Sequence, residues 1–129
     1  LRSEVPDRLE HIVSRIAHAF GATARFTFEK GNAGLANDPT CAEVARQAVL
    51  DMLGEQGVAD YRGTLSGEDF SEYLRIVPGV FCFVGTRNPQ VGADHPQHSC
   101  HYTVDEDVLA KGSMVAAQWA CRMLSGAKG

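Results

Sequence analysis

The chain has 129 residues, about the size of one domain, and its hydrophobic content of 44% and charged content of 22% are those of a globular protein, not a disordered one. A formal net charge of -4 without a basic stripe excludes general nucleic-acid binding, and no apolar run approaches the roughly 20 residues that span a bilayer. The four cysteines, Cys41, Cys82, Cys100 and Cys121, form no CxxC pair, which favours free thiols in a reducing cytoplasm.

The first 31 residues predict a helix followed by a strand. The segment 3–7 combines a proline with acidic residues, which is typical of a helix start, and Gly21 provides the stop. Apolar residues between these points recur at helical spacing and predict one buried stripe: Leu9, Ile12, Val13, Ile16, Ala17 and Phe20. Residues 22–29 then alternate between apolar and polar, as in a strand buried on one face. A shift in composition across residues 30–38 predicts a boundary between modules 1–31 and 32–129.

The second module opens with a strong helix signal. Asp38 is a good N-cap and Pro39 suits the first helical turn, so we expect a helix from there to Gly54. Its apolar stripe comprises Cys41, Val44, Ala45, Ala48, Val49, Met52 and Leu53. Residues 58–63 predict a short strand, and the polar step at 66–69 predicts the N-terminus of another helix that reaches Val77.

The last third of the chain predicts a buried strand, a long loop and a final helix. Residues 80–84 are continuously apolar, which fits a strand buried on both faces of a helix-covered sheet. Thr103 and Glu106 form a capping box ahead of an apolar helix over 108–124. These elements together predict an α/β fold. The loop of about 20 residues between the strand and the helix is long enough to suggest a function.

That loop contains metal-type ligands. His95, His98 and His101 are spaced three residues apart, and Cys100 lies among them. A structural zinc site needs four nitrogen or sulfur ligands, and a catalytic zinc site needs three protein ligands and an open position. The pattern alone leaves a metal role and a merely polar loop equally open.

Three motifs that follow one another along the chain favour a metal role for this loop. They are Gly67-Glu68-Asp69-Phe70-Ser71-Glu72-Tyr73, Val77-Pro78-Gly79-Val80-Phe81-Cys82-Phe83-Val84-Gly85-Thr86, and His98-Ser99-Cys100-His101-Tyr102 followed by Asp105-Glu106-Asp107-Val108-Leu109. Together they resemble the C-terminal part of the dinuclear metallopeptidase and amidohydrolase family of hippurate hydrolase, auxin-conjugate amidohydrolases, aminoacylase and the carboxypeptidase-G type enzymes. The segment before Pro39 is similar to the end of that family's lid, or dimerisation, domain.

The resemblance implies a role for each module. Residues 1–31 would be the terminal helix and strand of an α+β lid, and residues 32–129 the C-terminal half of a catalytic domain with a helix-covered sheet. His98 would bind one of two divalent metal ions per active site, zinc or else manganese or cobalt. Cys100 replaces a common proline, so His101 and Cys100 are the alternative ligands. Gly67, Glu68 and Asp69 would line the substrate pocket, although helix capping explains these three residues equally well.

The resemblance also implies what the intact parent does. It would be a cytoplasmic homodimer, joined through its lid, that hydrolyses N-acyl amino acids or small peptide-like amides without a nucleic-acid or membrane partner. The chain contains no His-x-Asp motif and no Glu-Glu pair, and it does not begin with Met, so we expect an inert fragment. Two alternatives stay open: a non-catalytic α/β binding or dimerisation module, and a small protein whose structural zinc is held by His95, His98, His101 and Cys100.

Overall fold

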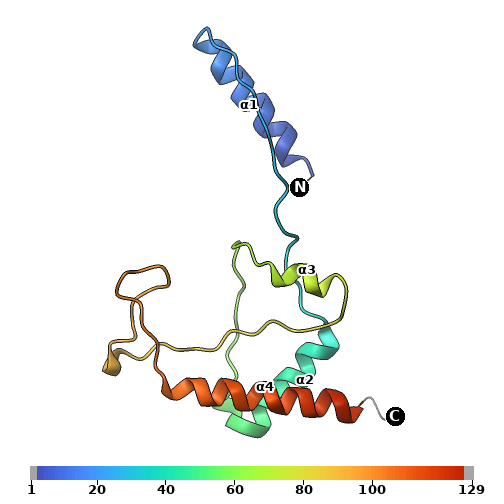
Figure 1. The fold of residues 1–129 in the computed structure, drawn as a ribbon, viewed down its shortest axis with the longest axis vertical. Coiled ribbons are helices and arrows are strands. Elements are labelled where there is room, and N and C mark those ends of the chain that lie inside the picture. The colour runs from blue at the N-terminus through green and yellow to red at the C-terminus, as the bar shows by residue number, and fades with distance from the viewer. Residues whose placement is uncertain (1–2, 127–129) are drawn as a thin grey trace. The chain divides into compact units, whose positions relative to one another are not determined.

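The computed structural model describes residues 3–126, and the chain separates into two compact units. One unit ends at Gly31 and the other starts at Asn32. The first contains helix α1 (Val5–Ala19). The second contains α2 (Pro39–Leu53), η1 (Glu55–Gly57), α3 (Phe70–Leu74), η2 (Pro89–Val91) and α4 (Asp107–Gly126), coloured from cyan to red in Figure 1. The division falls inside the predicted range of residues 30–38.

Helix α1 forms where the sequence predicts it, but its apolar stripe is not buried. Pro6 lies in its first turn, and Gly21 follows the helix with φ of 70°, a conformation that glycine adopts without strain. Leu9 is 40% exposed, Ile16 56% and Phe20 85%. The prediction of a buried stripe is therefore wrong for this unit, because residues 20–31 form no element that could cover the helix.

Helix α2 matches its prediction in bounds, cap and buried face. The Asp38 carboxylate accepts a hydrogen bond of 2.9 Å from the Cys41 backbone N–H, and Pro39 fills the first turn. Gly54 ends the helix with φ of 72°. Cys41, Ala45 and Ala48 lie at positions i, i+4 and i+7 and are all buried. Local signals alone therefore account for this helix.

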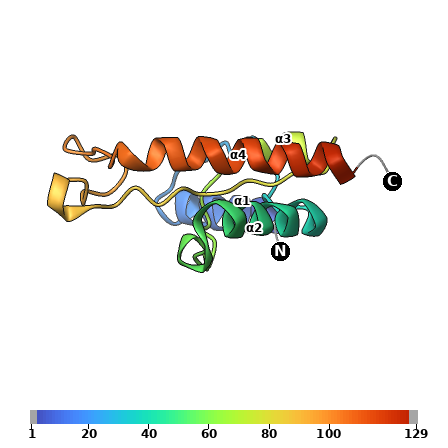
Figure 2. The same cartoon turned by 90° about the horizontal axis from the view of Figure 1, so that it is seen from below.

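Helix α4 lies along α2, and the two helices form the main packed layer of the second unit (Figures 1 and 2). The Trp119 indole N–H donates a 3.2 Å hydrogen bond to the Cys41 carbonyl. Asp51 of α2 also accepts hydrogen bonds of 2.9 Å from the Gln118 amide and 2.8 Å from the Arg122 Nε of α4. The small residues on the buried face of α2 allow this close approach.

Helix α3 is shorter than predicted. It spans only Phe70–Leu74, although the sequence indicated a helix as far as Val77. The Ile76 and Val77 N–H groups both donate to the Tyr73 carbonyl, so the chain leaves the helix in a tight turn. The Pro78-Gly79 step that follows cannot continue a helix, which explains the early end.

No strand is assigned within residues 3–126, so the described chain is helical and the predicted sheet is not observed there. Residues 22–29, 58–63 and 80–84 are not helical, but none of them pairs along its length with a neighbouring strand. An isolated bridge joins Asn88 to Ala93. A strand is defined by its ladder of hydrogen bonds, and a fully buried strand needs partners on both edges.

The apolar run at 80–84 is exposed instead of buried on both faces, which corrects the prediction. Phe83 is 57% exposed and Val84 53%. Near the start of the run, the Asn37 side chain exchanges hydrogen bonds of 3.0 and 2.8 Å with the Phe81 backbone. The Phe81 and Phe83 rings meet edge to face with their centroids 5.2 Å apart. The run thus makes backbone hydrogen bonds at Phe81, but no layer of the described residues buries Phe83 and Val84.

The core of the described residues is small. Its buried apolar side chains are Cys41, Ala45, Ala48 and Ala93, and Ser71 is a buried polar residue. The Ser71 hydroxyl finds no hydrogen-bond partner within the described part of the chain. All four cysteines are free thiols, as predicted, and only Cys41 is buried. Among residues 3–126, none of the helices has both the length and the apolar character needed to cross a membrane.

Candidate functional site

The loop that carries the three histidines, residues 87–104 (the histidine loop), is closed at its base by Asp105. The Asp105 N–H donates to the Thr86 carbonyl at 3.1 Å, and its carboxylate accepts from the Asn88 amide at 2.8 Å and from the Asp107 N–H at 3.1 Å. The Asn88 hydrogen bond, followed by that of Asp107, lowers the pKa of Asp105 below its usual value. One carboxylate thus fixes both ends of the loop and caps α4.

This arrangement was not predicted from the sequence. The predicted cap of α4 was formed by Thr103 and Glu106, whereas the Asp105 carboxylate makes the cap. The bond from Asn88 crosses 17 residues, so spacing along the chain does not reveal it. The sequence does carry one sign of the cap, because an aspartate side chain commonly accepts a hydrogen bond from the N–H two residues later, and Asp105 stands two residues before Asp107.

His98 lies exposed at the turn of the loop. Its φ of 68° is the one positive value among the described non-glycine residues. Histidine tolerates this left-handed region better than most side chains. The turn is held on either side, since the Ser99 N–H donates to the Pro96 carbonyl at 3.2 Å and the Tyr102 N–H donates to the Ser99 carbonyl at 3.1 Å. The backbone therefore presents the His98 residue to the surface.

The turn at His98 brings the two flanking histidines together. The ring centroids of His95 and His101 are 5.4 Å apart, and the ring planes are tilted by 43°. The His101 N–H also donates to the Ser99 hydroxyl at 3.1 Å, which holds that side of the loop. Nothing in the regular spacing of three residues distinguished this pair from pairs that include His98.

The four-ligand zinc site considered from the sequence does not assemble. Within residues 3–126, no group of three or more histidine, cysteine, aspartate or glutamate side chains is close enough to hold a metal ion. His98 and Cys100 are exposed and do not join the His95–His101 pair in such a group. The described residues thus offer at most one ligand, or one pair of ligands, at a time.

Gly67, Glu68 and Asp69 lie at the start of α3. The Glu68 carboxylate accepts a 3.1 Å hydrogen bond from the Phe70 N–H, so it caps the helix. The Asp69 side chain makes no capping hydrogen bond and is exposed. A side chain added at Gly67 would meet nothing within 4 Å, so the surface there is open. Capping accounts for the Glu68 side chain, whereas Asp69 contributes to the start of the helix through its backbone carbonyl, which accepts from the Glu72 N–H at 2.9 Å.

The structure does not bring this turn to the histidine loop. In Figures 1 and 2 the orange loop projects beyond the N-terminal end of α4, whereas α3 lies toward the other end of that helix. A substrate that touched both segments would need further protein between them. The two predicted site segments are therefore separate surfaces of this unit.

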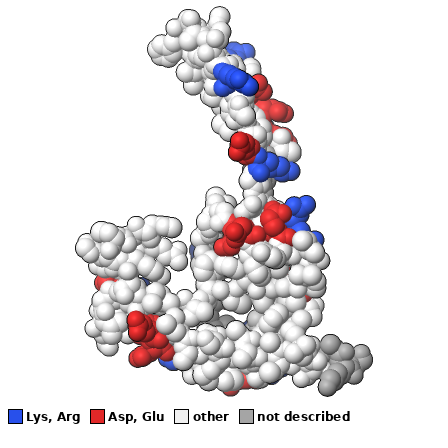
Figure 3. Space-filling view, viewed as in Figure 1, with Lys and Arg blue, Asp and Glu red and all other residues white. Residues whose placement is uncertain are grey.

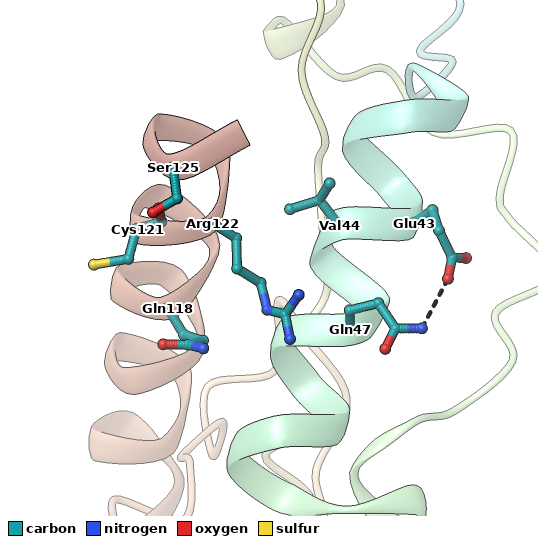
Figure 4. Close-up of a pocket in the computed structure, with 7 residues that line it drawn as sticks. All are labelled: Glu43, Val44, Gln47, Gln118, Cys121, Arg122 and Ser125. Atoms are coloured by element: carbon teal, nitrogen blue, oxygen red, sulfur yellow. Dashed lines mark hydrogen bonds between the residues drawn. The ribbon is translucent and has the colours of Figure 1, made fainter. Parts of the chain in front are cut away.

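A shallow cavity of about 380 Å³ lies between α2 and α4, away from both predicted segments. Its lining residues are Glu43, Val44, Gln47, Gln118, Cys121, Arg122 and Ser125. Figure 4 shows the Arg122 side chain directed toward α2 and the Cys121 sulfur directed away from it. The Arg122 guanidinium is already paired with Asp51. The cavity is thus a groove of the helix pair, with its cation neutralised.

The chain is similar to a known protein family and to several of its characterised members. The model of peptidase family M20/M25/M40 matches residues 4–122. Thermostable carboxypeptidase 1 of Saccharolobus solfataricus is 35% identical over 95% of this chain and 30% of its own length. The IAA-amino acid hydrolase ILR1-like 6 of Arabidopsis thaliana is 33% identical over 92% of this chain and 26% of its own length. The N-acetyl-L-cysteine deacetylase of Bacillus subtilis is 31% identical over 96% and 28%.

These matches cover almost all of this chain but a small part of each relative. The chain spans less than a third of the length of the curated proteins it matches. No solved structure gives a significant match. The family model covers more than nine-tenths of the chain and crosses the boundary between the two units. The chain therefore belongs to peptidase family M20/M25/M40.

Proposed function

We propose that this chain supplies the C-terminal part of a metal-dependent amidohydrolase that cleaves N-acyl amino acids or small peptide-like amides. The observation that carries the proposal is the family match over residues 4–122. The names of the relatives, a carboxypeptidase, an IAA-amino acid hydrolase and an N-acetyl-L-cysteine deacetylase, all describe removal or release of an amino acid from an acyl or peptide link. That shared chemistry is the basis for the substrate class.

Each unit takes its own part in this proposal. Residues 1–31 are the end of a lid or dimerisation domain, and residues 32–129 are the C-terminal half of the catalytic domain. The exposed apolar stripe of α1 supports the first assignment, since a stripe of this kind needs a covering layer. In the whole enzyme the lid would join two copies into a cytoplasmic homodimer.

The sheet predicted from the sequence belongs to this larger assembly. The run 80–84 is apolar, without assigned secondary structure, and more than half exposed at Phe83 and Val84. A strand of this composition is stable when neighbouring strands take up its backbone hydrogen bonds and helices cover its faces. We infer that strands from outside this chain provide those neighbours and complete an α/β catalytic domain.

His98 is the residue that we assign to the metal centre of the whole enzyme. Enzymes of this family are generally dinuclear and metal-dependent, and zinc, manganese or cobalt are the candidates. The residues present do not fit such a centre by themselves, because a catalytic ion needs about three protein ligands and His98 contributes one. The exposed, left-handed turn at His98 is suited to complete a site whose other ligands lie elsewhere.

The turn at Gly67 to Asp69 is assigned to the wall of the substrate pocket. The open space at Gly67 allows a ligand to approach the backbone closely. The Asp69 carboxylate is exposed and is not used for capping. Glu68 supports the same turn through its bond to the Phe70 N–H. A polar substrate group could therefore contact Asp69, with Glu68 holding the turn in place.

The first test is the activity of the 129-residue chain itself. We expect no hydrolysis of an N-acyl amino acid or a dipeptide in the presence of Zn²⁺, Mn²⁺ or Co²⁺, since one ligand neither holds nor activates a metal-bound water. Release of free amino acid is the measurement. Metal-dependent turnover by the purified chain would show that its own residues form a complete site.

The second test uses a full-length protein that carries this segment. Loss of even an outer-shell partner costs metal affinity about 10–100-fold, so His98→Ala should reduce kcat by about 100-fold or more. His11→Ala, on the exposed face of α1, is the matched control and should leave kcat unchanged. Wild-type activity in the His98→Ala variant would contradict the assignment of His98 as a metal ligand. An inactive wild-type protein that binds a partner would favour the alternative of a binding or dimerisation module.

A further inference from the structure

The contact between His95 and His101 follows from how the loop turns. Two hydrogen-bonded turns share Ser99: its N–H donates to the Pro96 carbonyl at 3.2 Å, and its carbonyl accepts from the Tyr102 N–H at 3.1 Å. The residues that flank these turns are six positions apart and are carried to the same side of the loop. Their rings lie with centroids 5.4 Å apart and planes tilted by 43°.

This separation fits two imidazoles that share one metal ion. A metal–nitrogen bond is about 2.0–2.1 Å, and a ring nitrogen lies roughly 1.1 Å from its ring centre, so two rings on one tetrahedral ion have centres roughly 5 Å apart. The observed 5.4 Å is close to that value.

We propose that His95 and His101 form a two-nitrogen site for a divalent transition-metal ion of the Ni²⁺, Cu²⁺ and Zn²⁺ class. Neutral imidazole is a preferred ligand for these ions. The pair gives two ligands and leaves the remaining positions to water, because no third histidine, cysteine or acidic side chain of the described residues joins it. The site is exchangeable and lies on the surface, so the fold of the chain does not depend on it.

The surroundings of the pair agree with a nitrogen-only site. Both histidines are exposed and reachable from solvent. On the face seen in Figure 3, the surface of the loop carries few side chains of Lys, Arg, Asp or Glu. Hard cations such as Mg²⁺ and Ca²⁺ prefer oxygen ligands. The site should therefore discriminate in favour of borderline-soft ions.

The site is separate from the role proposed for His98. His98 would serve a metal centre that needs ligands from outside this chain. The proposed His95–His101 site takes both of its protein ligands from this chain. Failure of one assignment leaves the other intact. A chain that binds no Ni²⁺ contradicts the present inference and says nothing about the enzyme.

The experiment is a calorimetric titration of the 129-residue chain with Ni²⁺, with the cysteine thiols kept reduced. Ni²⁺ is the probe because the exposed Cys100 thiol does not reduce it. We expect one equivalent of Ni²⁺ to bind. His95→Ala and His101→Ala should each weaken binding by at least about tenfold, the lower end of the cost of losing an outer-shell partner. A parallel titration with Mg²⁺ should give no heat of binding.

Matched variants test whether the pair is the site. His98→Ala and Cys100→Ser should bind Ni²⁺ as the wild type does. The double variant His11→Ala, His18→Ala should also be unchanged, because seven residues of α-helix separate these side chains by roughly 10 Å along the axis and prevent chelation. The proposal is overturned if no Ni²⁺ binds, if neither His95→Ala nor His101→Ala weakens binding, or if His98→Ala or Cys100→Ser abolishes it.

Discussion

Cys41 differs from the other three cysteines in its surroundings. It is 2% exposed at the α2–α4 contact, whereas Cys82, Cys100 and Cys121 are exposed. Burial raises the pKa of the Cys41 thiol, and the Asp38 carboxylate beside it raises that pKa further. The thiolate is the reactive form, so both effects protect this residue from alkylation. Its carbonyl is meanwhile used by Trp119, which ties the same residue to α4.

We predict that an alkylating reagent modifies Cys100 and Cys121 first and Cys41 last. Partial burial raises the pKa of Cys82, so this residue should react at an intermediate rate. Mass spectrometry of peptides taken at successive times measures the order. In denaturant all four should react at similar rates, which is the control. Early modification of Cys41 in the native chain would mean that α2 and α4 separate readily.

The α2–α4 pair is the element on which the second unit depends, and Asp51 is its polar link. The hydrogen bond from Gln118, followed by that from Arg122, lowers the pKa of Asp51 below its usual value. A lowered pKa in the folded state means that ionised Asp51 stabilises the fold. This contribution is fully present above the pKa of the unfolded state, about 3.9, and is lost as the pH falls through the lower folded value.

We therefore predict that Asp51→Asn destabilises the chain at pH 7 and that the difference from wild type shrinks as the pH falls below about 4. Urea denaturation followed by circular dichroism at a series of pH values measures this. Asp60→Asn, at an exposed position outside both helices, is the matched control and should show little effect at any pH. A difference between Asp51→Asn and wild type that persists at pH 2 would contradict the ionic explanation.

The contrast between α2 and the run 80–84 explains what the sequence could predict. The start, end and buried face of α2 depend on residues within 16 positions, from Asp38 to Gly54, and all three were predicted correctly. The fate of residues 80–84 depends on strands that pair with them, and none lies in the described chain. The histidine cluster was likewise evident from its composition. The pairing of His95 with His101 was not, because it depends on a positive φ at His98.

The chain consists of two units, and an irregular segment links helix α1 of the first unit to helix α2 of the second. Residues 20–38 contain no helix or strand, and most of them are exposed. The second unit has its own anchor just past the boundary, where the Ala33 N–H donates to the Glu72 carboxylate at 3.0 Å. Proteases cut where exposed backbone can adopt an extended form, and helices inside a packed layer resist them.

We predict that trypsin cuts after Arg25 and Lys30 well before it cuts after Arg46, which lies within α2. A fragment that starts at Gly31 should keep its helical circular dichroism when it is first released, because the contacts that hold α2 to α4 all lie beyond the cut. Mass spectrometry of the time course identifies the fragment. The double variant Arg25→Gln, Lys30→Gln should delay its appearance without changing the rate of cutting at Arg46. If cleavage at Arg46 kept pace with cleavage at Lys30, or if the fragment lost its helices once formed, the second unit would need residues 1–31 for its stability.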